Sequence, residues 1–517
     1  MELADDVGYQ PAPAWESDNI LVRRDHSFLR FLMPVAFPEQ TGQDHRFEQR
    51  AGKLVASGHW RLLGGETQGF LPHVRMHFNA VRRHGQYMAG ANGRHDKTAI
   101  DPAAAFGYIF TDTGLGQLSI PGSCVAFRVP GTSPSRLVEI EVISAQVGIF
   151  RLGVGFVALE VRPTSPALPD WLDALHFLRF YRGRGVSLTI AGAGADPDGR
   201  LKMENFLGAV LADAELDDES HPFQEPPHGS GRRKESWIRE LYTPGELLTY
   251  TALFVDGVPG GDQRRLLYNV LHRFRSASHA APAKEDGEDH WCLPYQQGQQ
   301  FVNSIQGSAF VAFDAERSSF TAQTLPLHLR TTYFTLLLLA LLQRFALDQL
   351  SESVARLTGR VLGGRERNRA RGELEGVTAL DSRLLDFTGR CYFVQVSQTA
   401  HHHDYYARLR EVNQIEGRYR EVTEEVGALR AHAGSRASAE QERASFRMAA
   451  ALMVITCVLL PLQVIESLFA TKLPELPGIR SLSPAGSAAA AGLVLVLATV
   501  IALAILYGSR RRRRKQS

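Results

Sequence analysis

Two long uncharged stretches near the C-terminal end constrain the fold more than any other feature of the sequence. Residues 448–465 contain no Asp, Glu, Lys or Arg over 18 positions, and residues 481–509 contain none over 29. An α-helix rises about 1.5 Å per residue and the hydrocarbon core of a bilayer is roughly 30 Å thick, so each stretch can cross a membrane once. We predict transmembrane helices over 448–470 and 485–507, joined by a proline-containing loop over 471–484.

Positive charges are distributed unevenly around these stretches. Close to the stretches, nine Lys and Arg flank the pair and two lie in the loop between them. The nine are Arg436, Arg443, Arg447, Arg510–Arg514 and Lys515, and the two are Lys472 and Arg480. Because cytoplasmic loops carry an excess of Lys and Arg, we predict a two-span protein of the inner (cell) membrane with cytoplasmic N- and C-termini and a basic cytoplasmic tail over 508–517. The polar, acidic N-terminus lacks the features of a signal peptide, which agrees with this orientation.

The overall charge excludes a broad nucleic-acid surface. The chain has 57 Lys and Arg against 55 Asp and Glu, a formal net charge of +2. The run RRRRRK has an alternative interpretation as a nucleic-acid or nuclear signal, but its position beside a span already explains it, so we expect no nucleic-acid partner. Four widely separated cysteines support neither a disulfide framework nor a zinc site. No catalytic constellation stands out, and we expect no enzymatic activity and no cofactor.

Apolar residues recur at steps of three and four ahead of the first uncharged stretch. They are Tyr405, Leu409, Val412, Ile415, Tyr419, Val422, Val426 and Leu429. The mean step lies close to 3.5 residues, the coiled-coil period. We predict one stalk helix over 380–447 that packs against partner helices and enters the membrane directly. The alternative is one side of a helical bundle within a single chain.

The same helix face, continued into the first span, presents small and polar side chains together with leucines. They are Leu452, Thr456, Leu460, Gln463, Ser467 and Ala470, with Glu466 alongside. Ionisable groups inside a membrane are candidates for function by default, so we single out Glu466. Its alternative position is the outer membrane interface, because only four residues separate it from the predicted end of the span.

Strand-like and helix-like segments alternate ahead of the stalk. Segments such as CVAFRV and LVEIEVIS have the β-branched, apolar pattern of strands, and DWLDALHFLRFYR has a helical pattern. We predict a cytoplasmic α/β domain over 1–325, with polar linkers at 213–236 and 276–288, followed by antiparallel helices over 326–379.

Two shorter segments resemble functional elements. The run YFTLLLLALL, residues 333–342, is too short to span a bilayer, and we predict a buried helix there. The run HHHD, residues 401–404, contains metal-ligating residue types, but adjacent side chains fan out around a helix, so we do not expect a shared ligand set.

The end of the first span resembles that of CorA-type magnesium transporters. In LLPLQVIESLFATKLPEL, residues 459–476, Pro461 and Leu462 match the family's Pro-Leu pair, and PEL at 474–476 matches its Pro-Glu-Leu element. Between these elements the family carries Gly-Met-Asn, whereas this chain has Ala-Thr-Lys at 470–472. The resemblance implies an α/β cytoplasmic domain, a long stalk helix and a two-helix transmembrane hairpin, assembled as a homopentamer in the lipid bilayer.

The same resemblance implies an ion channel or transporter gated by its cytoplasmic domain. Its pathway would be lined by Leu452, Thr456, Leu460, Gln463, Glu466 and Ser467, and its outer mouth by Ala470, Thr471, Lys472 and Glu475. The transported ion would be Mg²⁺ or another divalent cation. A ring of Lys472 would oppose cations at the mouth unless Glu475 pairs with it, and a ring of Glu466 below would favour them again.

The altered signature motivates an alternative from another functional class. This alternative is a ligand-gated membrane effector, whose cytoplasmic domain binds a small-molecule regulator such as a nucleotide messenger. A third hypothesis is a stalk-and-hairpin scaffold that does not conduct ions.

Overall fold

The computed structural model describes the larger part of the chain. The described residues are 20–36, 45–63, 69–78, 80–83, 86–89, 99–100, 107–120, 122–132, 136–182, 185–190, 201–214, 239–275, 291–316, 318–363, 370–470 and 492. They belong to two compact units, one of 1–356 with 379–426 and the other of 357–378 with 427–517. The predicted loop 471–484 and tail 508–517, and nearly all of the predicted linkers and second span, lie outside the described residues.

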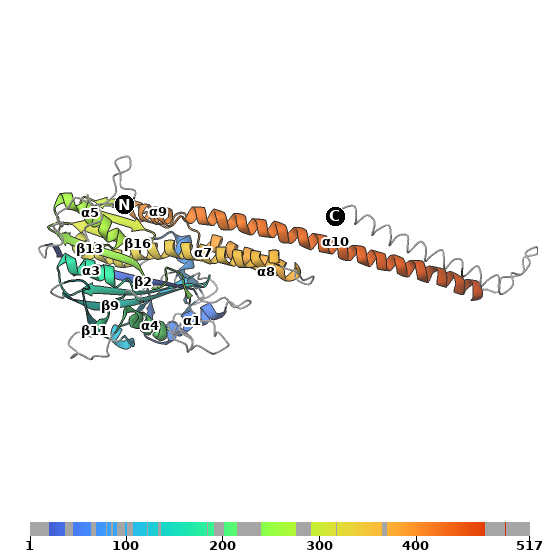
Figure 1. The fold of residues 1–517 in the computed structure, drawn as a ribbon, viewed down its shortest axis with the longest axis horizontal. Helices are drawn as coiled ribbons and strands as arrows, with labels where there is room; N and C mark the ends of the chain where they lie inside the picture. Colours follow the sequence, from blue (N-terminus) through green and yellow to red (C-terminus); the bar gives the residue numbers. More distant parts are fainter. Residues whose placement is uncertain are drawn as a thin grey trace, which may run out of the picture. The chain divides into compact units, whose positions relative to one another are not determined.

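The first unit is built on a 13-stranded mixed sheet (Figure 1). Along its main path the order is β11 (Leu188–Ile190), β8 (Cys124–Arg128), β9 (Leu137–Phe150), β10 (Val154–Pro163), β2 (Phe28–Ala36), β13 (Leu248–Asp256), β16 (Gly307–Phe313), β15 (Gln299–Ser304) and β14 (Cys292–Gln296). Neighbours pair antiparallel except β13 and β16, which are parallel. The predicted mixed α/β domain is confirmed.

Shorter strands complete the described sheets. Those pairing beside the main path are β1 (Leu21–Val22), β3 (Trp60–Leu62), β7 (Gly107–Asp112) and β12 (Arg239–Glu240). A separate three-stranded sheet contains β4 (Ala80–Arg83), β5 (Gln86–Ala89) and β6 (Ala99–Ile100), and the short helix α2 (Pro72–His77) precedes it.

One face of the large sheet forms the main apolar core. Alternate β2 residues, among them Phe31 and Met33, pack there with residues of the helices α1 (His45–Ala56), α3 (Leu168–Phe177), α4 (Met203–Asp213) and α5 (Gly260–His272). In α3 the buried Leu168, Trp171 and Leu175 recur at the helical spacing, which gives that helix one apolar face. Successive strand residues point to opposite faces, so the intervening β2 residues lie on the other side.

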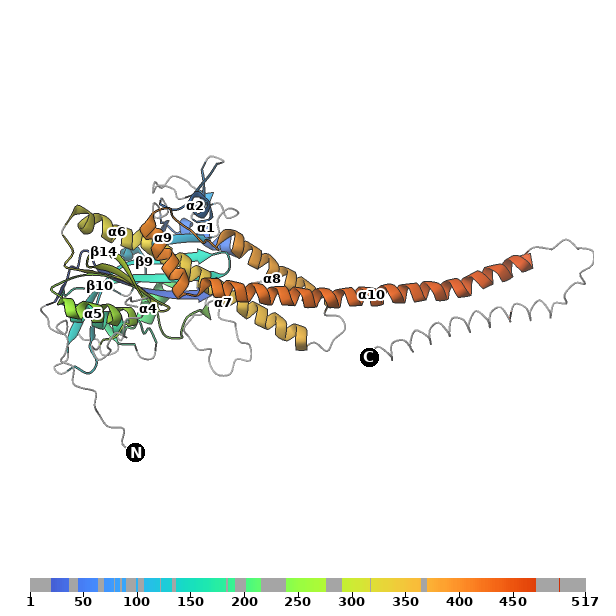
Figure 2. The same ribbon diagram turned by 90° about the horizontal axis from the view of Figure 1, so that it is seen from above.

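The other face of the sheet is covered by helices from the second half of the chain. These are α6 (Leu325–His328), α7 (Phe334–Gly363) and α9 (Ala400–Val412), with π-helical segments at Phe320–Thr324 and Leu329–Tyr333. Aromatic rings bridge the two layers, with Phe156 against Phe345 at 6.2 Å and Phe301 against Tyr405 at 4.4 Å between centroids. Figure 2 shows α4 and α5 on one side of the strands and α6 and α9 on the other.

The apolar run 333–342 is a buried helical segment, as predicted. Each of its residues is buried within the chain. Where side chains are described, one helix is long and apolar enough to cross a membrane, Phe320–Arg360, and 72% of its most apolar window is buried. This run is therefore covered by protein rather than left for lipid.

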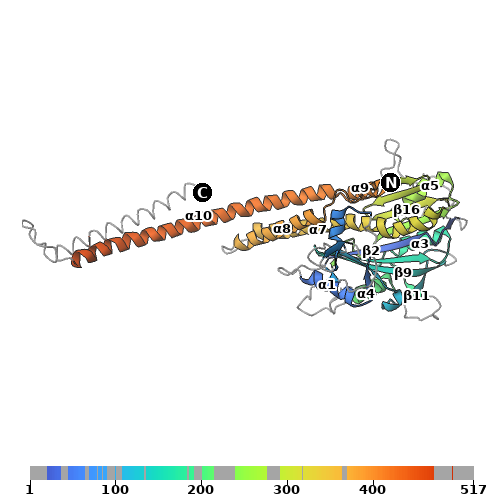
Figure 3. The same cartoon turned by 180° about the vertical axis from the view of Figure 1, so that it is seen from behind.

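The predicted stalk over 380–447 is divided into three helices. Residues 380–390 belong to α8 (Ala370–Arg390), which lies antiparallel to α7, with contacts at Arg383–Ser353 and at Gly376–Leu357 (Figure 3). The chain leaves helical geometry after Arg390, forms α9, and starts α10 (Ile415–Ala470) after Gln414. The prediction of one uninterrupted helix over 380–447 was therefore wrong.

Side chains from α7 and α9 stabilise the first break. Gln343 donates to the carbonyl of Cys391 at 2.6 Å, and Tyr406 donates to that of Phe393 at 3.1 Å. At the second break Gln414 adopts a left-handed φ of 54°, which ends the helical path of α9. Neither break contains proline, so the amino-acid composition did not indicate that the helix is interrupted at these positions.

The apolar stripe with the coiled-coil period is buried within the single chain. Tyr405, Leu409, Val422, Val426 and Leu429 are all buried, and Tyr419 stacks on Tyr392 at 4.2 Å between centroids. The prediction that this stripe awaits partner subunits was therefore wrong, and the intramolecular alternative holds. Both arrangements require the same period, because each buries one side of a helix.

Candidate pathway helix and polar row of the sheet

The C-terminal half of α10 exposes large apolar side chains. Six of them expose 46–66% of their surface: Phe446, Met448, Leu452, Met453, Ile455 and Leu459. At about 100° per residue they cover an arc of about 180° around the helix. An exposed apolar surface of this extent is typical of a segment that contacts lipid or another protein.

The predicted pathway residues share one side of α10. The helix is continuous through Ala470, so Leu452, Thr456, Leu460, Gln463, Glu466, Ser467 and Ala470 lie within an arc of about 120°. Leu452, Thr456 and Gln463 are exposed, and Thr456 donates its hydroxyl to the Leu452 carbonyl at 2.8 Å. For Leu460, Glu466, Ser467 and Ala470 the helical backbone alone is described. Thr471, Lys472 and Glu475, predicted at the outer mouth, lie outside the described residues.

A second candidate site, which we call the polar row, crosses the helix-covered face of the sheet. Glu160 of β10 is the register partner of Arg30 of β2, Arg30 is that of Tyr250 of β13, and Tyr250 is that of Ser308 of β16. Asn303 of β15 pairs with Ser308 and completes the row. Residues paired in register point to the same face, so five polar side chains form a line beneath the helices.

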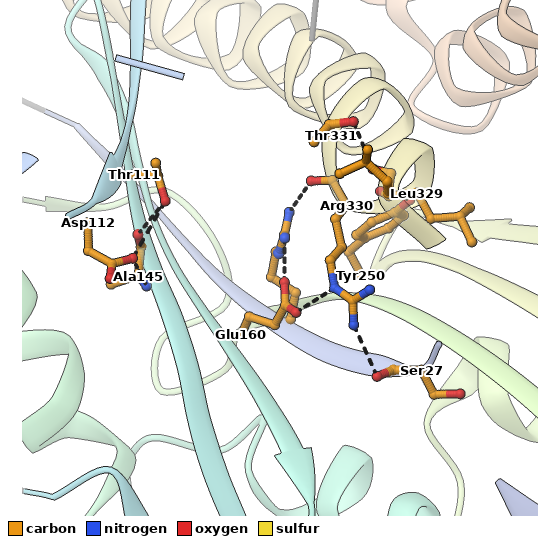
Figure 4. A network of polar contacts seen from close by, with 11 residues as sticks. Ser27, Thr111, Asp112, Ala145, Glu160, Tyr250, Leu329, Arg330 and Thr331 are labelled. Carbon is orange, nitrogen blue, oxygen red and sulfur yellow. Dashed lines mark hydrogen bonds and ion pairs between the residues drawn. The ribbon is translucent and has the colours of Figure 1, made fainter. Parts of the chain in front are cut away.

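The row binds the segment that leads into α7. Arg330, in the π-helical segment Leu329–Tyr333, donates its Nε to Glu160 at 2.8 Å, while Arg30 donates to the other Glu160 oxygen at 2.5 Å (Figure 4). Arg30 also donates to the backbone carbonyl of Arg330 at 3.1 Å, and Tyr250 donates to that of Leu329 at 2.7 Å. In a separate contact, Asp112 accepts from the backbone N–H of Ala145 at 3.0 Å.

The row also binds α9. Tyr405 donates to Ser308 at 2.9 Å, and Ser308 in turn donates to Asn303 at 2.7 Å. The segment that leads into α7 and the helix α9, which directly precedes α10 along the chain, are thus attached to strands of one sheet. The polar row is therefore suited to transmit a change in the α/β domain to the helices that precede α10.

The charges in the row are balanced mainly by one carboxylate. Burial alone raises the pKa of Glu160, but the adjacent guanidinium groups of Arg30 and Arg330 outweigh it and hold that pKa below its ordinary value. Phe28 and Phe334 lie against the cations, with the Arg30 guanidinium 4.0 Å from the Phe334 ring centroid. Glu160 is therefore ionised at neutral pH and is the ionic centre of the row.

π-Helical geometry places the carbonyl groups that the row binds. A π-helical turn is wider than an α-helical one, is rare, and is frequent at functional sites. The segment Leu329–Tyr333 supplies both the Leu329 and the Arg330 carbonyls. This segment therefore depends on side chains of the sheet for part of its hydrogen bonding.

Sequence reasoning missed the polar row. Its signal was a charge within each of two otherwise apolar stretches, Arg30 in FLRFLMPVA and Glu160 in VGFVALEVRP, where a second charge, Arg162, lies near the strand end. Isolated charges in buried strands are expected to have partners. Their pairing depends on the register between β2 and β10, which a single sequence does not show.

The histidine-rich start of α9 does not form a metal centre with its neighbours. Among the described residues no three His, Cys, Asp or Glu side chains are placed to hold a metal ion together. Instead His401 packs on Tyr295 and His402 packs on Tyr333.

Comparisons with known proteins identify similar solved structures but no family. No protein-family model and no curated protein matches the sequence. The structure is similar to that of the full-length CmaX protein, at 13% identity and a TM-score of 0.19, over 51% of this chain and 89% of that one. It is also similar to the CorA magnesium transporter from Methanocaldococcus jannaschii, at 13% identity and a TM-score of 0.22, over 53% of this chain and 94% of that one. With TM-scores this low, function has to be argued from the residues themselves.

Proposed function

We propose that the protein is not an enzyme but a membrane ion channel or transporter that moves metal cations. In this proposal residues 448–470 of α10 form the first span, residues 485–507 form the second, and the connecting loop lies outside the cell. Several copies assemble around a pathway lined by one side of α10, with a pentamer as the expected number by resemblance to CorA-type transporters. The protein lies in the inner membrane of the cell, and both of its termini face the cytoplasm.

The observation that carries the membrane assignment is the uncovered apolar surface of α10. Ile455 and Leu459 each expose about half of their surface in a segment with no charged side chain from Met448 to Ile465. Burying a large apolar side chain completely is worth about 1.5–3 kcal/mol, so leaving six of them half exposed to water is costly. Insertion of the charge-free segment into a bilayer as part of an assembly removes this cost, because lipid and neighbouring copies then cover the side chains that water would otherwise contact.

Polar groups on one side of the same helix support an aqueous pathway. Thr456, Gln463, Glu466 and Ser467 fall on that side, and polar groups within a span face a pathway or another helix rather than lipid. Leu452 and Leu460 on the same side would form hydrophobic constrictions that close when water leaves them. Glu466 would attract cations near the outer end.

The outer mouth would carry both signs of charge. Lys472, preceded by Ala470 and Thr471, would repel cations there, and Glu475 would offset it by pairing. Mg²⁺ and other divalent cations are the ions to test first, as cargo rather than as a bound cofactor. The α/β domain would gate the pathway through the polar row, which attaches α9 and the start of α7 to the sheet.

Ion flux into liposomes tests this function. We expect the full chain to pass divalent cations, and Glu466→Gln to reduce that flux while Glu442→Gln, on the same helix ahead of the span, leaves it unchanged. Equal flux from both variants would contradict the pathway assignment.

Absence of flux would favour a different function. If a well-formed oligomer in the bilayer passes no ions, transport is wrong and the ligand-gated effector becomes the better hypothesis. The observation behind that alternative is Ala-Thr-Lys at residues 470–472, where CorA-type transporters carry Gly-Met-Asn.

A further inference from the structure

Two histidines in the first turn of α9 pack on aromatic rings of the helical layer and the edge of the sheet, and a third histidine, His328, acts on one of them electrostatically. His401 and His402 lie in that turn, and His328 is the last residue of α6. The His401 ring lies 5.0 Å from the Tyr295 ring of β14, and the His402 ring lies 5.2 Å from the Tyr333 ring, centroid to centroid. The first turn of α9 thus contacts both β14 and the π-helical segment through imidazole rings.

His402 is packed closely on several sides. Its Nδ1 lies 3.4 Å from the hydroxyl of Ser397, which donates to the Gly69 carbonyl at 2.8 Å. A Cβ atom added to Gly69 would lie 3.6 Å from Cε1 of His402, so the backbone at Gly69 borders the ring directly. A change at His402 would therefore disturb contacts with Tyr333, Ser397 and the segment at Gly69 together.

The surroundings of this cluster oppose a positive charge. Burial, followed by His328 and then His401, lowers the pKa of His402. The first turn of α9 contains no acidic residue, and the N-terminus of a helix carries a partial positive charge. Burial and neighbouring phenols raise the pKa of Tyr333 well above its ordinary value, so the facing phenol stays neutral.

Among the residues that the structure describes, no carboxylate acts on the pKa of His402. Asp404, the nearest acid along α9, is exposed to solvent. The groups facing His402 from other elements are His328 of α6, the Tyr333 ring and the Gly69 carbonyl behind Ser397. A proton added to this cluster would find repulsion from two imidazoles and from the helix end.

We propose that His402, packed between Tyr333, Ser397 and the backbone at Gly69, forms an acid-sensitive contact that holds the first turn of α9 in place at neutral pH and releases it on protonation. The inference deepens the proposed ion transport by naming a regulation of it, and its functional meaning rests on that proposal. The structural part, release of α9 by acid, stands on the contacts of the cluster alone.

The junction between α9 and α10 would transmit this release. The two helices are separated by Asn413 and Gln414. Asn413 donates to the Leu409 carbonyl of α9 at 2.8 Å, and its own carbonyl accepts from Arg418 of α10 at 3.1 Å. Arg344 of α7 donates to the Asn413 side chain at 3.2 Å. A displacement of α9 therefore acts on the first turn of α10.

The direction of the pH effect follows from the lowered pKa of His402. A histidine whose pKa is lower in the packed state than in the free state contributes fully to packing above the free value of 6.5. As the pH falls below that value, the released state gains protons first and becomes favoured. For one proton the shift amounts to at most about tenfold per unit of pH.

Hydrogen exchange of the full chain in detergent micelles tests the contact. We expect amides of residues 400–406, after correction for intrinsic rates, to exchange up to about tenfold faster at about pH 5.5 than at about pH 6.5. The double variant His328→Gln/His402→Gln should lose this difference. His432→Gln, an exposed histidine of α10, should keep it and serves as the matched control.

Two outcomes would overturn the proposal. One is equal corrected exchange of wild-type residues 400–406 at both pH values; the other is an undiminished difference in the double variant. If that variant does not fold, the single variant His401→Gln, at an exposed position, takes its place and should reduce the difference. Hydrogen exchange does not depend on ion conduction. If acid releases the first turn of α9 in a protein that passes no ions, the proposed transport function is contradicted and the acid-sensitive contact is still supported.

Discussion

Two apolar helical segments of this chain have similar composition and opposite surroundings. Residues 333–342 are buried within the chain, whereas α10 exposes about half of each of six large apolar side chains between Phe446 and Leu459. The first segment is short and is followed by Gln343 and Arg344; the second belongs to 18 residues without a charge. Length and flanking charge, rather than apolar character, separate a core helix from a candidate span.

The largest expected effect is on the buried apolar segment, residues 333–342. Leu337→Asp places an unpaired charge in the core, and we expect it to cost more than about 4 kcal/mol or to prevent folding. Leu337 is 1% exposed, whereas Leu385 of α8 is 73% exposed, so Leu385→Asp should change stability by less than about 0.5 kcal/mol. Denaturant unfolding in detergent measures both. A mild effect of Leu337→Asp would contradict burial of this segment.

The next effect concerns the attachment of the buried segment to the sheet. Glu160→Gln leaves Arg30 and Arg330 without their counter-charge, and we expect a loss of about 3–5 kcal/mol in unfolding free energy. Glu141→Gln is the matched control, because Glu141 also pairs with two arginines but is partly exposed. Its loss should stay below about 1 kcal/mol.

Acid should reproduce the loss of the Glu160 contact. The pKa of Glu160 is lowered in the fold, so its contribution is complete above the ordinary value of 4.5 and disappears as the pH falls through the folded value. Between pH 7 and about pH 5 the unfolding free-energy difference between wild type and Glu160→Gln should stay constant, and it should shrink at lower pH. A difference that shrinks already near neutral pH would contradict the ion pairing.

A smaller effect is expected on membrane insertion of the exposed apolar segment of α10. Val454→Asp, opposite the predicted pathway side of the helix, would place a charge toward lipid at a cost of about 3 kcal/mol for membrane insertion. Thr456→Asp falls on the predicted pathway side and should insert more readily. Carbonate extraction of membranes measures the inserted fraction. Equal insertion of both variants would argue against distinct lipid and pathway sides.

The smallest effect concerns the junction where α10 starts. Gln414→Gly replaces a side chain in left-handed geometry by a residue without that penalty, and we expect a gain of about 0.5–1 kcal/mol. Gln441→Gly, in the interior of α10, should instead destabilise by about 1 kcal/mol. The same unfolding assay measures both variants. Opposite signs would confirm that the helix break is built into the chain at Gln414.

Much of the fold was predictable because its signals are local. The strand patterns and the short apolar run 333–342 report burial directly, and the structure confirms both. The apolar stripe from Tyr405 to Leu429 was assigned to the wrong partner. Its helical period indicates that one side of the helix is covered, but it does not indicate which part of the protein covers that side. The breaks after Arg390 and at Gln414 depend on distant side chains such as Gln343 and Arg344.

The candidate sites were predictable to different degrees. The pathway side of α10 follows from helical spacing and needs only a continuous helix, which the structure provides through Ala470. The role of Glu466, Lys472 and the other pathway and mouth residues stays a prediction. The polar row was not predictable, because Arg30 and Glu160 are 130 positions apart and meet through strand register.

A spin label at residue 454 tests the central claim, that residues 448–470 of α10 cross a lipid bilayer. Residue 454 lies on the side of the helix opposite the predicted pathway. Val454→Cys would be labelled in a chain whose four native cysteines are replaced by alanine, and reconstituted in liposomes. We predict frequent collisions of the label with oxygen and few with a water-soluble nickel complex, as for a site within the bilayer. Frequent collisions with the nickel complex and few with oxygen would place residue 454 in water and contradict the membrane assignment.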